Sequence, residues 1–71
     1  MNYIIVVFKA RTETLSFASI LRGYNVPFQI INTPRSLNLS CGISVKMPAV
    51  KRDLAESIIS QKGFQSFAGI F

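Results

Sequence analysis

The 71-residue chain has eight Lys or Arg against three Asp or Glu, for a formal net charge of +5, and it has no histidine and one cysteine. These counts exclude an internal disulfide, a structural zinc site built by this chain alone, and the Cys-His and Ser-His-Asp arrangements of nucleophilic catalysis. The length allows one domain, residues 1–71, and the positive charge favours acidic partners.

The first half of the chain predicts a strand, a helix and a second strand. Residues 3–8 are β-branched or aromatic and too few for a helix, so they predict a central strand. Apolar side chains recur at helical spacing in the next segment, with Thr12 or Thr14 as the expected cap and Asn25 as the left-handed residue after the helix. Residues 26–31 predict a strand whose early proline restricts it to a sheet edge.

The second half predicts a strand, a helix and a last strand after a long polar connection at residues 32–42. Residues 43–47 alternate apolar and polar side chains, as a half-buried strand does. Apolar residues then step by four along a helix that starts after Pro48 and ends before Gly63. Residues 64–71 predict the last strand.

Six elements in this order fold most simply as an α+β ferredoxin-like β-α-β-β-α-β sandwich, a four-stranded antiparallel sheet with two helices on one face. Right-handed crossovers place the first and third strands in the centre. The end of the sheet that holds Cys41 then also holds Lys9, Arg11 and the start of the first helix. The last strand is an edge without charged residues, which predicts a homodimer.

Cys41 is the main candidate for chemistry. A thiolate is the reactive form of cysteine, and nearby Lys or Arg side chains lower the pKa of a thiol. Arg35 lies in the same loop, Ser40 offers a hydroxyl beside the sulfur, and Gly42 lets the backbone approach closely. An unpaired cysteine at the start of a strand is as often a small buried hydrophobe. The residues alone therefore leave a reactive and a structural Cys41 open.

Other features argue against several classes of partner. The longest apolar run, residues 3–8, is far shorter than the roughly 20 residues that span a bilayer, and no basic stretch precedes it as in a secretory signal. We therefore expect a cytoplasmic protein that does not bind a membrane. The third strand has no basic-glycine-aromatic run, which disfavours nucleic acid. We expect no metal and no cofactor.

Residues 33–42, Thr-Pro-Arg-Ser-Leu-Asn-Leu-Ser-Cys-Gly, resemble the motif of the selenium/sulfur (Se/S) carrier protein-like family of small bacterial and archaeal proteins. The likeness extends along the chain as a pattern, although Asn38 and Leu39 stand where the family tends to have small polar residues. The resemblance implies that Cys41 carries sulfur or selenium. It also implies that five residues shape the loop of Cys41: Thr33, Pro34, Arg35, Ser40 and Gly42.

The sequence thus predicts a small non-enzymatic carrier that holds sulfur or selenium on Cys41 as a persulfide or selenosulfide and delivers it to partner enzymes. Arg35 is the first choice for the positive charge beside the thiolate, with Lys9 or Arg11 second. The pKa of Cys41 should then lie below the unperturbed value of about 8.5. The alternative is a small interaction or regulatory module in which Cys41 is structural.

Overall fold

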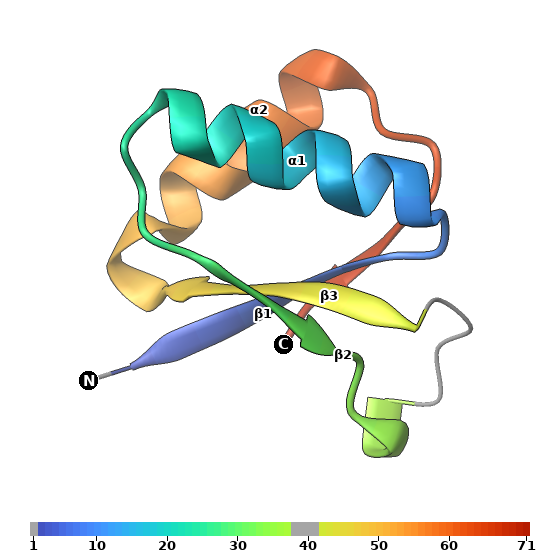
Figure 1. The fold of residues 1–71 in the computed structure, drawn as a ribbon. Helices are drawn as coiled ribbons and strands as arrows, with labels where there is room; N and C mark the ends of the chain where they lie inside the picture. The colour runs from blue at the N-terminus through green and yellow to red at the C-terminus, as the bar shows by residue number, and fades with distance from the viewer. Residues whose placement is uncertain (1, 38–41) are drawn as a thin grey trace.

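The computed structural model describes residues 2–37 and 42–71 (Figure 1). Two short 3₁₀ turns, η1 and η2, accompany the strands and helices. The elements in chain order are β1 (Tyr3–Phe8), α1 (Arg11–Gly23), β2 (Gln29–Asn32), η1 (Arg35–Leu37), β3 (Ile43–Pro48), η2 (Ala49–Lys51), α2 (Arg52–Lys62) and β4 (Phe67–Ile70).

The four strands form one antiparallel sheet in the order β2-β3-β1-β4. Both helices lie on the same face of this sheet (Figure 1). The central strands are β1 and β3, with Val6 opposite Val45, and the edges are β2 and β4. This arrangement confirms the predicted ferredoxin-like sandwich.

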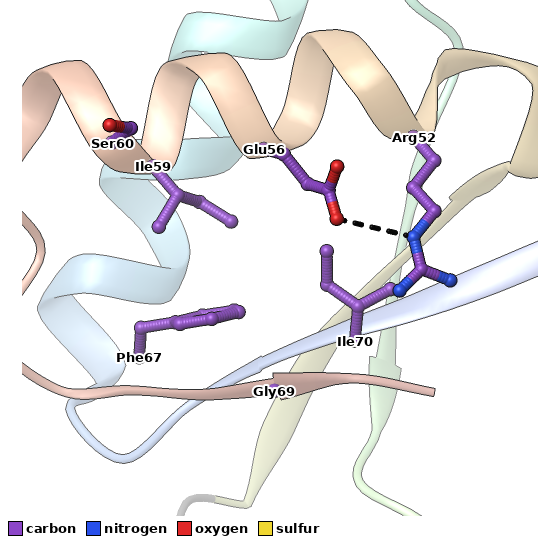
Figure 2. A pocket seen from close by; sticks show the side chains of 7 residues that line it. All are labelled: Arg52, Glu56, Ile59, Ser60, Phe67, Gly69 and Ile70. Carbon is purple, nitrogen blue, oxygen red and sulfur yellow. Dashed lines mark hydrogen bonds and ion pairs between the residues drawn. The ribbon is translucent and has the colours of Figure 1, made fainter.

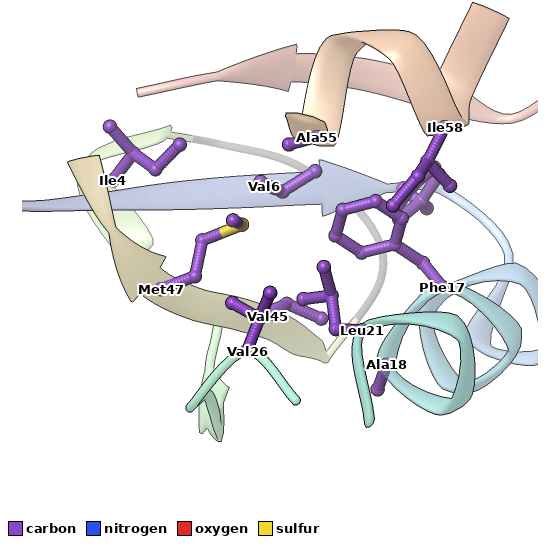
Figure 3. Close-up of a cluster of buried hydrophobic side chains, with 11 residues drawn as sticks. Ile4, Val6, Phe17, Ala18, Leu21, Val26, Val45, Met47, Ala55 and Ile58 are labelled. Carbon is purple, nitrogen blue, oxygen red and sulfur yellow. The ribbon is translucent and has the colours of Figure 1, made fainter. Parts of the chain in front are cut away.

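The hydrophobic core fills the space between the sheet and the helices (Figure 3). Alternate residues of β1 point into it, and α1 and α2 add apolar side chains three or four residues apart, as one face of a helix does. The core residues are Ile4, Val6, Phe8, Phe17, Ala18, Leu21, Val26, Val45, Met47, Ala55 and Ile58. Among the described helices, none combines the length and the apolar character needed to cross a membrane.

The start of α1 differs from the prediction. Ala10 is the N-cap residue and makes no side-chain cap, so the prediction of Thr12 or Thr14 as the cap is wrong. The helix begins earlier because β1 ends at Phe8 and only two residues separate the two elements. Thr14 instead donates its hydroxyl to the Ala10 carbonyl at 3.2 Å, within the first turn.

Both edge strands are shorter than predicted. Pro27 has no N–H for a ladder hydrogen bond, and β2 begins two residues after it, at Gln29. The last strand begins at Phe67, because Ser66 bonds to the start of α1 instead of extending the strand. The predicted left-handed residue after α1 is confirmed, since Asn25 has φ = 60°.

Candidate functional site

One end of the sheet gathers the last residues of β1 and β2 and the first residues of β3 and β4. This follows from the antiparallel pairing, which places Asn32 opposite Ile43 and Phe8 opposite Phe67. We call this end the loop end, and the opposite end, at Tyr3 and Pro48, the proline end. The residues of the motif that the structure describes all belong to the loop end.

The loop between β2 and β3 leaves the sheet through a hydrogen-bonded neck made by Thr33, Gly42 and Ser44. The Thr33 N–H donates to the Gly42 carbonyl at 3.0 Å. The hydroxyl oxygens of Thr33 and Ser44 lie 2.6 Å apart, and Ser44 is fully buried. A buried hydroxyl needs such a partner, so the neck fixes both ends of the loop to β3.

The first turn of the loop presents Arg35 to solvent. Pro34 is half-buried after the neck, and its carbonyl accepts a hydrogen bond from the Leu37 N–H at 3.1 Å, which closes the η1 turn. Arg35 begins this turn and is exposed. Ser40 and Cys41 lie outside the described residues, so the proximity of Arg35 to Cys41 stays a prediction.

Lys9 and Arg11 lie at the same end of the sheet as the neck. Lys9 follows β1, is exposed, and donates its backbone N–H to the Ser66 carbonyl at 2.7 Å. Arg11 is the first residue of α1 and is also exposed. Because β1 and β3 are neighbours, the end of β1 that leads to Lys9 and Arg11 lies beside the strand that begins after Gly42.

A second polar cluster at the loop end, which the sequence did not reveal, joins α1 to the start of β4. The Ser66 hydroxyl donates to Glu13 Oε1 at 2.5 Å, and the Ser66 N–H donates to the same oxygen at 2.8 Å. The Ser66 oxygen in turn accepts the Ala10 N–H at 3.1 Å, which caps the helix from a distant part of the chain. The hydroxyl and N–H of Ser66 hold the pKa of Glu13 below its usual value.

In this cluster the carboxylate of Glu13 accepts its hydrogen bonds from neutral donors. Glu13 therefore bonds to Ser66 and not to the neighbouring cations. The described residues form a single ion pair, Arg52 with Glu56 on α2. The exposed cations of the loop end, Lys9, Arg11 and Arg35, are thus available to an anionic group.

Phenylalanine rings pack beneath the loop end. Phe8 contacts three other rings, and the centroid distances are 5.3 Å to Phe17, 5.0 Å to Phe64 and 5.8 Å to Phe67. Tilted and edge-on packing of this kind is favourable for aromatic pairs. Phe8 and Phe17 are fully buried, whereas Phe67, at the start of β4, is 38% exposed.

A separate groove of about 410 Å³ runs between α2 and the edge strand β4 (Figure 2). Ile59, Phe67 and Ile70 give it an apolar lining. Arg52 and Glu56, four residues apart on α2, pair at 3.4 Å along one side of it. The groove shares no residue with the neck, so it does not belong to the predicted site.

The family model described as "Putative Se/S carrier protein-like" matches residues 2–68. The chain belongs to this family. No curated protein and no solved structure matches the chain. Membership of the Se/S carrier-like family makes a carrier role the coarse expectation.

Proposed function

We propose that this protein is a non-enzymatic carrier that holds sulfur or selenium on Cys41 and passes it to a partner enzyme. The observation that carries the proposal is the family match over residues 2–68 together with the Ser-Cys-Gly sequence that ends at the neck. A carrier needs one nucleophilic thiol and no second catalytic group, because the donor and acceptor enzymes supply the rest. A chain with one cysteine and no histidine meets that requirement.

The loading step is a transfer between two sulfur atoms and needs no oxidant. The Cys41 thiolate attacks the terminal sulfur of a persulfide on the donor enzyme, a new S–S bond forms, and the donor cysteine leaves as a thiolate. A donor that carries a terminal selenium atom gives a selenosulfide by the same exchange. Delivery repeats the exchange, with Cys41 as the leaving thiolate.

Positive charge at the loop end supports this chemistry. We propose that Arg35 stabilises the Cys41 thiolate and the anionic terminal atom, and that Lys9 or Arg11 assists. Thr33 and Gly42 would hold the loop at its neck, Pro34 would direct the chain away from the sheet, and the Ser40 hydroxyl would stand beside the sulfur.

The carrier's surroundings follow from the same proposal. A thiol that must stay reduced between transfers fits the cytoplasm, and the partners are sulfur or selenium donor and acceptor enzymes. We also propose a homodimer through β4, because Phe67 is exposed on this edge strand and no charged residue protects it. Sedimentation that shows only a monomer at high protein concentration would remove the dimer and leave the carrier untouched.

The direct test is to incubate the protein with a cysteine desulfurase and cysteine and to measure its intact mass. The wild type should gain one sulfur atom, and Cys41→Ser should gain none. Arg35→Ala should load more slowly, whereas Arg52→Ala, which removes the same charge from the rim of the groove between α2 and β4, should load at the wild-type rate. A folded wild type that is neither loaded nor alkylated at Cys41 would overturn the carrier in favour of an interaction module with a structural cysteine.

A further inference from the structure

The proline end of the sheet has a notch where the β2–β3 ladder stops. The Thr33 N–H to Gly42 carbonyl bond sets the positions of the hydrogen-bonded pairs in this ladder, which then recur at every second residue. The last hydrogen-bonded pair of this ladder is Gln29 with Lys46. The next pair would be Pro27 with Pro48, but neither proline has an N–H to donate, so the ladder stops there.

A cleft of about 560 Å³ occupies this notch. Its walls are rings: two aromatic side chains, Tyr3 and Phe28, and the pyrrolidines of Pro27 and Pro48. Gln29 and Lys46 are the polar residues of the lining. A mostly apolar cleft with a few polar groups, of this volume, is the usual form of a ligand site.

The charge at the cleft is positive. The Lys46 Nζ lies 4.7 Å from the centre of the Tyr3 ring, and the Arg22 guanidinium lies 5.9 Å from the centre of the Phe28 ring. Among the described residues no carboxylate pairs with either cation. Both cations lie over aromatic rings and make no ion pair within the part of the chain that the structure describes. A carboxylate of a ligand can therefore pair with them.

Two neighbouring hollows extend the cleft into a band. One, of about 460 Å³, shares Pro27 and Phe28 with it and reaches Arg22 on α1. The other, of about 410 Å³, shares Tyr3 and Pro48 with it and reaches Val50, a residue that is 87% exposed. The α1–β2 connection and the start of β1 lie at this same end of the molecule (Figure 1). A band of three adjacent hollows that share lining residues suits an extended chain better than a single small molecule.

We propose that this band binds an extended acidic segment of a partner protein. An aromatic side chain of that segment enters the cleft between Tyr3 and Phe28, and a flanking carboxylate pairs with Lys46. The proposal does not depend on the carrier function, because the band lies at the end of the sheet opposite the neck. If both proposals hold, the partner is held at one end while Cys41 remains accessible at the other.

The test is to titrate the isotope-labelled protein with the peptide acetyl-Asp-Glu-Phe-Asp-Glu-amide and to measure the NMR chemical shifts of the protein's backbone amides at each step. The shifts should concentrate at Tyr3, Phe28, Gln29 and Lys46. Lys46→Gln should weaken binding about fivefold, the scale of one partly exposed ion pair. The matched variant Lys62→Gln removes the same charge from the far end of α2 and should bind as the wild type does.

Other ligands show whether the band binds an acidic peptide, a small aromatic acid or RNA. A peptide with Ala in place of Phe should bind more weakly, and one with Lys in place of the four acids should not bind. Equal weakening by Lys46→Gln and Lys62→Gln, or no binding of the acidic peptide, would overturn the proposal. Tighter binding of N-acetylphenylalanine alone would assign the cleft to a small aromatic acid, and tighter binding of an oligouridylate would assign it to RNA; either result overturns the peptide site.

Discussion

The two ends of one sheet use their aromatic rings in opposite ways. At the loop end Phe8 is fully buried and its ring contacts three other phenylalanines. At the proline end Tyr3 is 48% exposed, and the ammonium of Lys46 lies over its ring. Rings that pack together exclude water and add stability, whereas rings that face cations and solvent leave a surface that a ligand can cover.

The polar groups differ in the same sense. At the loop end the hydroxyls of Thr33, Ser44 and Ser66 form short hydrogen bonds inside the molecule. At the proline end the polar groups that line the cleft belong to Lys46 and Gln29, and the ladder stops at two prolines. A fixed neck suits a loop that must present one reactive atom, and an open notch suits recognition of a partner.

The largest expected effect is on stability at the loop end. Phe8→Ala should lower the free energy of unfolding by about 3–5 kcal/mol, because it removes a buried ring and leaves a cavity among the other phenylalanines. Tyr3→Ala at the proline end should cost only about 1 kcal/mol, because Tyr3 is already exposed to water. Urea unfolding of both variants measures the difference.

A domain of this size has modest stability, so Phe8→Ala could be unfolded in water. Phe8→Leu, which keeps most of the buried volume, should cost about 1–2 kcal/mol and keeps the comparison measurable. Equal costs for the substitutions of Phe8 and Tyr3 would contradict the contrast between the two ends.

The sequence was sufficient for the elements and the topology of this fold. The apolar run at 3–8, the helical spacing of apolar residues in the next segment, and the left-handed Asn25 all have local causes, and the structure agrees with each. The edge strand β2 was predicted too long, although Pro27 already marked the limit, because strand ends depend on which residues pair across the ladder.

The contacts of the site were less predictable than its position. Thr33 was expected to support the loop, and its partner Ser44 is a polar residue of the alternating stretch 43–47 that is nevertheless buried. Glu13 lies in the first turn of α1, and its partner, Ser66, lies 53 residues away in the sequence. Such pairs follow from register and tertiary packing, which local patterns do not encode.

The next effect concerns the neck. Ser44→Ala should lower the free energy of unfolding by about 1–2 kcal/mol, because the half-buried Thr33 hydroxyl loses its partner. Thr33→Val with Ser44→Ala should cost less than the sum of the two single changes, since the double variant leaves no unpaired hydroxyl. Gln29→Ala, on an exposed edge of the proline end, should cost under about 0.5 kcal/mol. Additive single costs would show that the two hydroxyls do not interact.

A smaller effect is expected on the thiol. The pKa of Cys41 should lie below about 8.5, and Arg35→Ala should raise it by less than about one pH unit, since Arg35 is exposed and solvent screens its charge. Arg22→Ala, which removes the same charge near the proline end, should leave it unchanged. The rate of iodoacetamide alkylation as a function of pH measures all three proteins. An unshifted wild-type midpoint, or equal effects of the two variants, would contradict the assignment of Arg35.

The smallest effect is the pH dependence that Glu13 gives to the loop end. Its pKa is lowered in the folded protein, chiefly by the hydrogen bond from the Ser66 hydroxyl and then by the Ser66 N–H. The ionised form is therefore favoured by folding, and its contribution to stability is complete above the pKa of an unfolded glutamate. That contribution is lost as the pH falls through the lower pKa of the folded state.

Glu13→Gln should thus be less stable than the wild type at neutral pH, and the gap should shrink as the pH falls, because a protonated Glu13 resembles glutamine. Urea unfolding at a series of pH values measures the gap. Glu56→Gln removes an equal charge from the exposed ion pair with Arg52, which makes it the matched control for net charge. If Glu13→Gln lost the same stability at every pH, the strength of the hydrogen bonds from Ser66 would not depend on the charge of Glu13. The ionised carboxylate would then not stabilise the polar cluster that joins α1 to the start of β4.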